Sequence, residues 1–108
     1  MQIEIIKNRS DIGAGTRGSD MGIDAIEIAA INNHNPFFTR YPYVDVKTHN
    51  ETIYNKSEFE VAHRVNYVNE QCERVSESVK NRLMAKHFPI VLSGDHSSAL
   101  GTLSGISA

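Results

Sequence analysis

Along this 108-residue chain, short apolar runs alternate with longer segments whose hydrophobic residues have helical spacing. Residues 2–7 contain three isoleucines and no helix or strand breaker, so they predict a first strand. Further strands are expected at 43–47 and, as a fully apolar run, at 90–92. Between the first two strands, isoleucine and alanine dominate residues 22–31, which predicts a mostly buried helix.

The clearest predicted element is a long helix over residues 57–86. Ser57 and Glu60 form a capping box, in which each side chain accepts a hydrogen bond from an otherwise unpaired backbone N–H. Apolar residues then recur at intervals of three or four, at Phe59, Ala62, Val65, Val68, Cys72, Val75, Val79 and Leu83. This spacing places one apolar stripe against a core, and the strand at 90–92 is the surface that we expect it to cover.

The order strand, helix, strand, helix, strand predicts an α/β fold, with a parallel sheet and right-handed crossovers. Parallel sheets need helices on both faces. Three strands with about two and a half helices are few for a complete fold of this kind. We therefore expect residues 1–108 to be the amino-terminal part of a single larger α/β domain.

Composition and charge exclude several classes of protein. The chain is 40% hydrophobic and 22% charged, with a net charge of −2, values that are ordinary for a folded domain. It lacks a signal peptide and an apolar run of the roughly 20 residues that span a bilayer, so we expect a cytoplasmic protein without a membrane partner. The 11 basic residues are dispersed and predict no nucleic-acid partner. The single cysteine, Cys72, is expected to be a buried free thiol.

A glycine-rich loop, GAGTRG, begins at Gly13 and matches the dinucleotide-binding pattern G-x-G-x-x-G. Two spacings weaken this interpretation. Residues 8–12 separate the strand from the first glycine, and Asp45 lies 27 residues after Gly18, beyond the roughly 20 that place an acid on the ribose. A loop that merely turns the chain is favoured, while a Rossmann-type module that uses Gly13, Gly15 and Gly18 stays as the alternative.

The densest candidate chemistry follows the third predicted strand, in the segment from Ser93 to Ser97. Open α/β sheets bind ligands at the carboxyl ends of their strands. There, Gly94 permits a tight turn, Asp95 can orient its neighbours, and His96 offers an imidazole suited to a divalent transition metal. A lone loop histidine is more often a surface residue than a metal ligand. From these residues alone, His96 is therefore open to both interpretations.

At this point the sequence resembles a known family. The segment 93–105, SGDHSSALGTLSG, is similar to the first metal-binding motif of the ureohydrolases, which include arginase, agmatinase and formimidoylglutamase. That motif is usually written G-G-D-H-S and is followed by a helix of small residues. Residues 13–26 resemble the loop by which these enzymes pass from strand one into helix one, so the resemblance explains the glycine loop without a nucleotide.

The resemblance, which is most arginase-like, implies a three-layer α/β/α fold with two manganese ions at the carboxyl ends of the strands. His96 matches the family's first metal-ligand histidine, and Asp95 matches a supporting residue. The implied reaction is hydrolysis of a small guanidino substrate, with arginine preferred, to urea and an amine. In it, a hydroxide that bridges the two ions attacks the central carbon. A homo-oligomer is compatible with this assignment.

The departures from the family pattern limit what this chain can do alone. Ser93 replaces the first glycine, which is awkward only if that residue needs a positive φ. The family's D-x-H-x-D and D-x-D motifs have no counterpart in the 108 residues, and the other four histidines lack their spacing. We therefore assign no catalytic residue and predict no hydrolase activity for this segment alone. A non-catalytic interaction fragment, marked by an exposed apolar stripe, is a third hypothesis.

Overall fold

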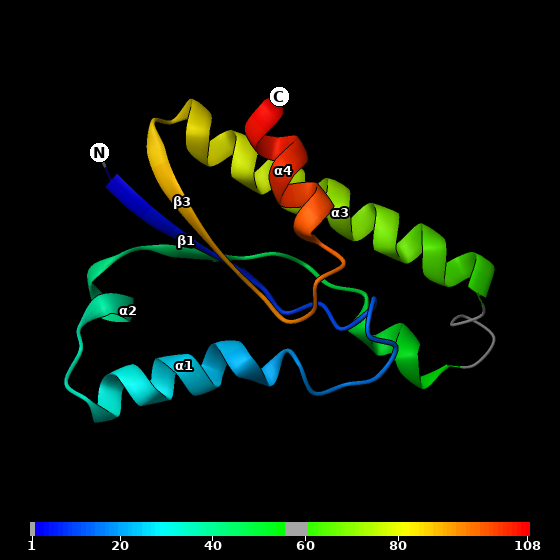
Figure 1. Ribbon diagram of the computed structural model, residues 1–108, viewed down its shortest axis with the longest axis horizontal. Coiled ribbons are helices and arrows are strands. Elements are labelled where there is room, and N and C mark those ends of the chain that lie inside the picture. Colours follow the sequence, from blue (N-terminus) through cyan, green and yellow to red (C-terminus); the bar gives the residue numbers. More distant parts are fainter. Residues whose placement is uncertain (1, 56–60) are drawn as a thin grey trace.

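The computed structural model describes residues 2–55 and 61–108. Three parallel strands form one sheet in the order β2-β1-β3, with β1 (Gln2–Asn8) between β2 (Tyr43–Asp45) and β3 (His87–Ser93). All three predicted strands are therefore confirmed. Figure 1 shows the sheet between two long helices, as expected for parallel strands joined by crossovers.

The helices follow the predicted order. They are α1 (Met21–Asn32), the short α2 (Phe37–Arg40), α3 (Val61–Met84) and α4 (Ala99–Ser107), and a 3-10 helix, η1 (Asn50–Tyr54), precedes α3. The capping box that was expected at the start of the long helix lies outside the described residues, as do the side chains of the first members of its stripe.

One face of the sheet is covered by α3. Val75 and Val79 of this helix pack with Ile6 of β1 and with Val46 in a buried cluster. The predicted stripe is thus confirmed in the middle of the helix. It is wrong at the ends, because the side chains of Val65 and Leu83 are exposed. A 24-residue helix is about 36 Å long, whereas a seven-residue strand spans about 23 Å, so the helix overhangs the sheet.

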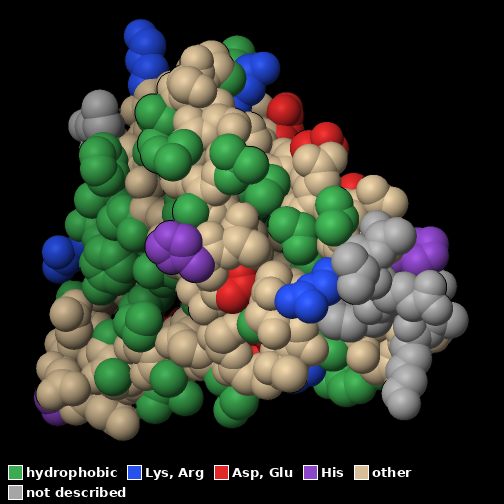
Figure 2. Space-filling view, turned by 45° about the vertical axis from the view of Figure 1, so that its right-hand side comes forward, with side chains coloured by type: hydrophobic (Ala, Val, Ile, Leu, Met, Phe, Trp, Pro, Cys, Tyr) green, Lys and Arg blue, Asp and Glu red, His purple; other side chains and the backbone are tan. Residues whose placement is uncertain are grey.

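The other face of the sheet carries α1, which Figure 1 shows on the side opposite α3. An ion pair of 3.2 Å joins Glu27 of α1 to Lys7 of β1, and Asp24 pairs with Arg9 just after that strand. The prediction of a mostly buried helix is wrong, since Ile23 is the buried residue of α1 while Ile26 and Ile31 are exposed. The physical reason is that the face of α1 with its acidic side chains meets the end of β1, so that several isoleucines on the other faces point to solvent. Figure 2 shows hydrophobic side chains gathered in patches on the surface.

The last helix, α4, packs directly on α3 through two glycines. A Cβ atom built on Gly101 would lie 2.4 Å from the carbonyl oxygen of Cys72, and one built on Gly105 would lie 2.7 Å from that of Ser76. Since real Cβ atoms do not approach that closely, both glycines are needed for the two helix backbones to meet. Cys72 is a buried free thiol, as predicted.

Across residues 2–55 and 61–108, no helix has both the length and the hydrophobicity needed to cross a membrane.

Candidate functional site

The candidate site begins where β1 and β3 end side by side. Asn8, the last residue of β1, is in register with Ser93, the last residue of β3. The backbone N–H of Gly94 then donates a 3.1 Å hydrogen bond to the carbonyl oxygen of Asn8. The two strand ends therefore fix the start of the turn that carries Asp95 and His96.

Close packing at this turn favours glycine at position 94. A Cβ atom on this residue would lie 3.1 Å from the carbonyl oxygen of Ser10 and 3.2 Å from the backbone nitrogen of Asp20. Both are backbone atoms of the first loop, which cannot move aside as a flexible side chain can. The glycine thus lets the first loop and the histidine turn lie against each other.

Ser93 fits the turn without strain. Among the described residues, positive φ angles occur at Gly15, Gly18, His34 and Lys86, and Ser93 is not one of them. A side chain is therefore tolerated where the family motif has glycine. This removes the difficulty that the substitution raised in the sequence.

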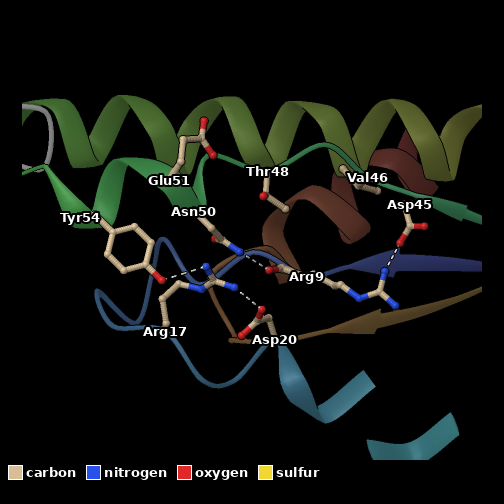
Figure 3. Close-up of a pocket in the computed structure, with 9 residues that line it drawn as sticks. All are labelled: Arg9, Arg17, Asp20, Asp45, Val46, Thr48, Asn50, Glu51 and Tyr54. Atoms are coloured by element: carbon tan, nitrogen blue, oxygen red, sulfur yellow. Dashed lines mark hydrogen bonds and ion pairs between the residues drawn. The ribbon is translucent and has the colours of Figure 1, made fainter. Parts of the chain in front are cut away.

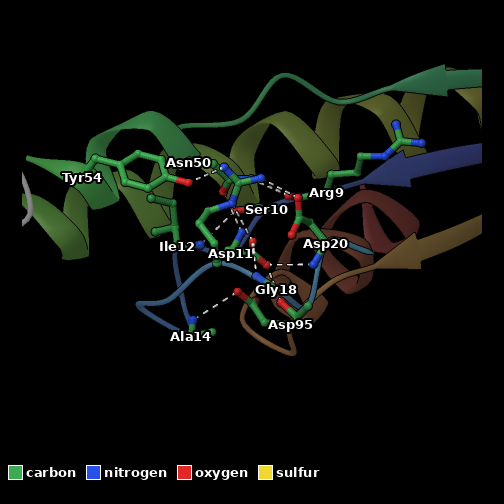
Figure 4. A network of polar contacts seen from close by, with 12 residues as sticks. Arg9, Ser10, Asp11, Ile12, Ala14, Gly18, Asp20, Asn50, Tyr54 and Asp95 are labelled. Carbon is green, nitrogen blue, oxygen red and sulfur yellow. Dashed lines mark hydrogen bonds and ion pairs between the residues drawn. The ribbon is translucent and has the colours of Figure 1, made fainter. Parts of the chain in front are cut away.

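Asp95 holds the turn to the first loop, as Figure 4 shows for its contact with Ala14. One carboxylate oxygen accepts hydrogen bonds from the backbone N–H groups of Gly13 (3.1 Å) and Ala14 (3.2 Å). The other accepts from the backbone N–H of Ser97 (2.9 Å) and from its hydroxyl. With four donors on its two oxygens, this carboxylate acts as a supporting group.

The same contacts disfavour a dinucleotide site in the glycine loop. The amides of Gly13 and Ala14, of the kind that would bind a pyrophosphate, already bind the carboxylate of Asp95. Asp45, the acid that would bind the ribose, forms an ion pair with Arg9 instead (Figure 3). The loop turns the chain and braces the histidine turn.

Sequence reasoning missed the residue that organises the first loop, Asp11. Its side chain is fully buried. Its carboxylate accepts hydrogen bonds from donors later in the loop, namely Arg17, Gly18, Ser19 and Asp20. Its backbone N–H donates to Asn50 at 2.7 Å. An acid among glycines and serines is ordinary in loops, so no spacing in the sequence could have identified it.

The lining of a cavity of about 490 Å³ beside this loop includes two ion pairs, Arg9 with Asp45 and Arg17 with Asp20 (Figure 3). Arg17 donates to Asp20 at 2.6 Å and to the hydroxyl of Tyr54 at 3.2 Å. Burial raises the pKa of Asp20, but hydrogen bonds from Arg17 and with Asp11 outweigh that effect, so the pKa is lowered. The hydrogen bond to Asp20 in turn raises the pKa of Arg17. These pairs stabilise the loop.

His96 projects at the carboxyl end of β3 and is exposed. It lines a cavity of about 320 Å³ together with Val91, Ala99 and Leu103. In the described part of the chain, β3 pairs on one side with β1, and its other edge carries no strand. The imidazole is therefore accessible next to a free sheet edge.

His96 offers one imidazole, which is the commonest protein ligand for metal ions. Within residues 2–55 and 61–108, no cluster of three or more His, Cys, Asp or Glu side chains could hold a metal ion. Among the other histidines, His49 lies 2.7 Å from Glu70 and His87 lies 2.6 Å from Glu4. Asp95 and His96 are consecutive residues of the turn after β3, and these two histidines lie in separate pairs.

Comparison with known proteins agrees with this architecture. The arginase family model matches residues 2–108. An arginase of Bacillus subtilis (strain 168) is 34% identical over 105 residues, which cover 95% of this chain and 34% of that protein. An arginase of Brevibacillus brevis is 32% identical over 107 residues, which cover 89% of this chain and 32% of that protein.

The fold matches as well. The crystal structure of arginase from Bacillus subtilis superposes with a TM-score of 0.71 at 30% sequence identity, covering 99% of this chain and 34% of that one. The chain thus spans roughly a third of the length of these relatives. Because the family model matches from the first strand to the last helix, the chain belongs to the arginase family.

Proposed function

We propose that these residues form the amino-terminal third of a manganese-dependent ureohydrolase that hydrolyses a guanidino substrate to urea and an amine. Arginine is the favoured substrate, because both curated relatives are arginases. The observation that carries the proposal is the family match over residues 2–108, which includes the turn that presents His96. Membership in the family supports a hydrolase, and the metal and the substrate are our inference from it.

In this proposal, His96 supplies one imidazole ligand to a manganese pair. Manganese, when bound, activates water and holds it against the guanidinium carbon. The residues of this chain position that ligand: Gly94 lets the turn pack on the first loop, and the carboxylate of Asp95 fixes the turn from both sides. The free edge of β3 leaves room for a further strand beside His96. Carboxylate ligands on such a strand would complete the site.

A measurement of urea release tests the proposal. With arginine and manganese, the 108-residue chain alone should release no urea, because one imidazole cannot hold two ions. A polypeptide in which the same residues are followed by the rest of an arginase-type domain should release it. There, His96→Ala should lower turnover at least a hundredfold.

The matched control is His63→Ala, since His63 is an exposed histidine on α3. This variant should keep its turnover. Equal rates for the wild type and His96→Ala would show that His96 is not a ligand. Urea release by the 108-residue chain alone would contradict our proposal that the site needs ligands from outside these residues. The cytoplasmic location, the absence of membrane and nucleic-acid partners, and the homo-oligomer stay predictions.

A further inference from the structure

A buried chain of amides lies directly behind the histidine turn. Gln71 of α3 donates a 2.8 Å hydrogen bond from its side-chain nitrogen to the side-chain oxygen of Asn8. The side-chain nitrogen of Asn8 donates in turn to the hydroxyl of Ser93, at 3.4 Å. Gln71 and Asn8 are each 1% exposed. The chain thus runs from the middle of α3 through the end of β1 to the end of β3.

Gln71 occupies a position where the fold would otherwise place an apolar residue. It precedes Val75 and Val79 by one and two helical turns, so all three lie on the same face of α3. The two valines are fully buried in the core against Ile6. Moreover, the side-chain oxygen of Gln71 is buried and has no hydrogen-bond partner among the described residues. A buried unpaired oxygen costs free energy that an apolar side chain would not.

Asn8 holds the turn at two points. Its side chain binds Ser93, and its backbone carbonyl oxygen accepts the N–H of Gly94 at 3.1 Å. The residue that follows Gln71, Cys72, donates from its thiol to the carbonyl oxygen of Ser97 at 3.4 Å. Two consecutive residues of α3 therefore support the turn on both sides of His96.

We infer that Gln71 is a positioning residue for His96, acting through Asn8 and Ser93. The amide chain fixes the end of β3, from which the turn starts, and so sets the direction in which the imidazole is presented. Groups that orient metal ligands without touching the metal commonly change metal affinity when they are removed. The inference rests on the proposed role of His96 as a manganese ligand, while the ordering of the turn can be measured without metal.

The test compares Gln71→Met with the wild type by NMR on the metal-free 108-residue chain. Methionine keeps the length of the side chain and removes the donor. The amides of residues 95–97 should change from rigid, with order parameters of about 0.85, to flexible, below about 0.6. Hydrogen exchange of the Gly94 amide should accelerate about tenfold, because the residue that accepts its hydrogen bond is no longer held.

Val75→Ala is the matched control. It removes buried methyl groups from the same stripe, one turn further from the site, and it should leave the order of residues 95–97 unchanged. Unchanged order in Gln71→Met, or equal loosening in both variants, would overturn the inference. If Gln71→Met does not fold, Ser93→Ala provides the test, since it removes the hydroxyl that accepts from Asn8 and keeps the Cβ atom. Unchanged exchange of the Gly94 amide in that variant would also overturn it.

A manganese titration separates this inference from the proposed function. It uses the longer polypeptide, in which the rest of an arginase-type domain follows these residues. Gln71→Met should weaken the apparent affinity at the turn about tenfold, whereas Val75→Ala should not change it. Absence of manganese binding near His96 in the wild type of that longer polypeptide would contradict the proposed function. The order measurements would still decide the role of Gln71. Equal affinities in the wild type and Gln71→Met would contradict the positioning role.

Discussion

At the scale of single residues, two carboxylates determine how the loops at the carboxyl edge of the sheet are arranged. Asp11 binds four donors of its own loop, and Asp95 binds backbone amides from two segments about 80 residues apart in the chain. Sequence alone predicted Asp95 as a supporting residue through the family motif. Asp11 could not be predicted, because what distinguishes it is complete burial and the convergence of its donors, which only the folded loop creates.

Replacing Asp95 tests whether the carboxylate joins the two segments. Asp95→Asn keeps the shape of the side chain but can no longer accept on both terminal atoms, so either the amides of Gly13 and Ala14 or those of Ser97 lose their acceptor. We expect the free energy of unfolding, measured with urea, to fall by about 2 kcal/mol. Asp24→Asn, which breaks an exposed ion pair with Arg9, should cost less than about 1 kcal/mol. Equal losses would contradict the bracing role.

Glu4 gives the fold a defined pH dependence. Burial raises the pKa of this carboxyl, but hydrogen bonds from His87 and Arg82 outweigh burial and hold the pKa below its usual value of 4.5. Because the folded pKa is the lower one, the ionised carboxylate stabilises the fold above about pH 4.5. That stabilisation is lost as the pH falls through the folded pKa.

The free energy of unfolding, measured by urea titration from pH 6 to pH 3, should therefore decrease toward acid. Glu4→Gln should show a shallower decrease, since the glutamine does not titrate. A decrease of the same size in both proteins would show that Glu4 does not contribute to it.

At the scale of elements, the hydrophobic pattern located the three strands and the long helix because those segments follow the spacing of buried positions. It failed for α1, where isoleucine and alanine dominate and the pattern does not show that the face with Asp24 and Glu27 meets the sheet. The answer depends on Lys7 and Arg9 of the first strand and its loop, which attract Glu27 and Asp24. The hydrophobic periodicity of one segment cannot predict ion pairs that it forms with another segment.

Because α3 and α4 are in close contact, adding a single methyl group between them should lower the free energy of unfolding. In Gly101→Ala, the added Cβ would lie 2.4 Å from a backbone oxygen of α3, so the helices must separate. We expect a loss of about 1–3 kcal/mol in the free energy of unfolding. Gly22→Ala in α1 is the control, because nothing lies within 4 Å of the new atom. It should stabilise the chain by about 0.5–1 kcal/mol. A stable Gly101→Ala variant would contradict this packing.

At the scale of the whole molecule, the chain contributes three parallel strands to an arginase-family fold, and the outer edge of β3 carries no strand among the described residues. The turn carrying His96 follows β3, and the outer face of α4 presents Leu100, Leu103 and Ile106 to solvent. The sequence motif located this edge, since strand and turn residues are adjacent in the chain. The remaining ligands could not be located, because the family's carboxylate motifs have no counterpart in these 108 residues.

The decisive measurement is a manganese titration of the longer polypeptide, in which the rest of an arginase-type domain follows these residues and residues 1–108 carry ¹⁵N. Binding is followed by the paramagnetic broadening of the amide signals. We predict that the amides of residues 94–97 broaden first and that His96→Ala abolishes this local effect, while His63→Ala does not. Broadening that begins elsewhere, or that persists around residues 94–97 in His96→Ala, would contradict the claim that this turn presents a manganese ligand.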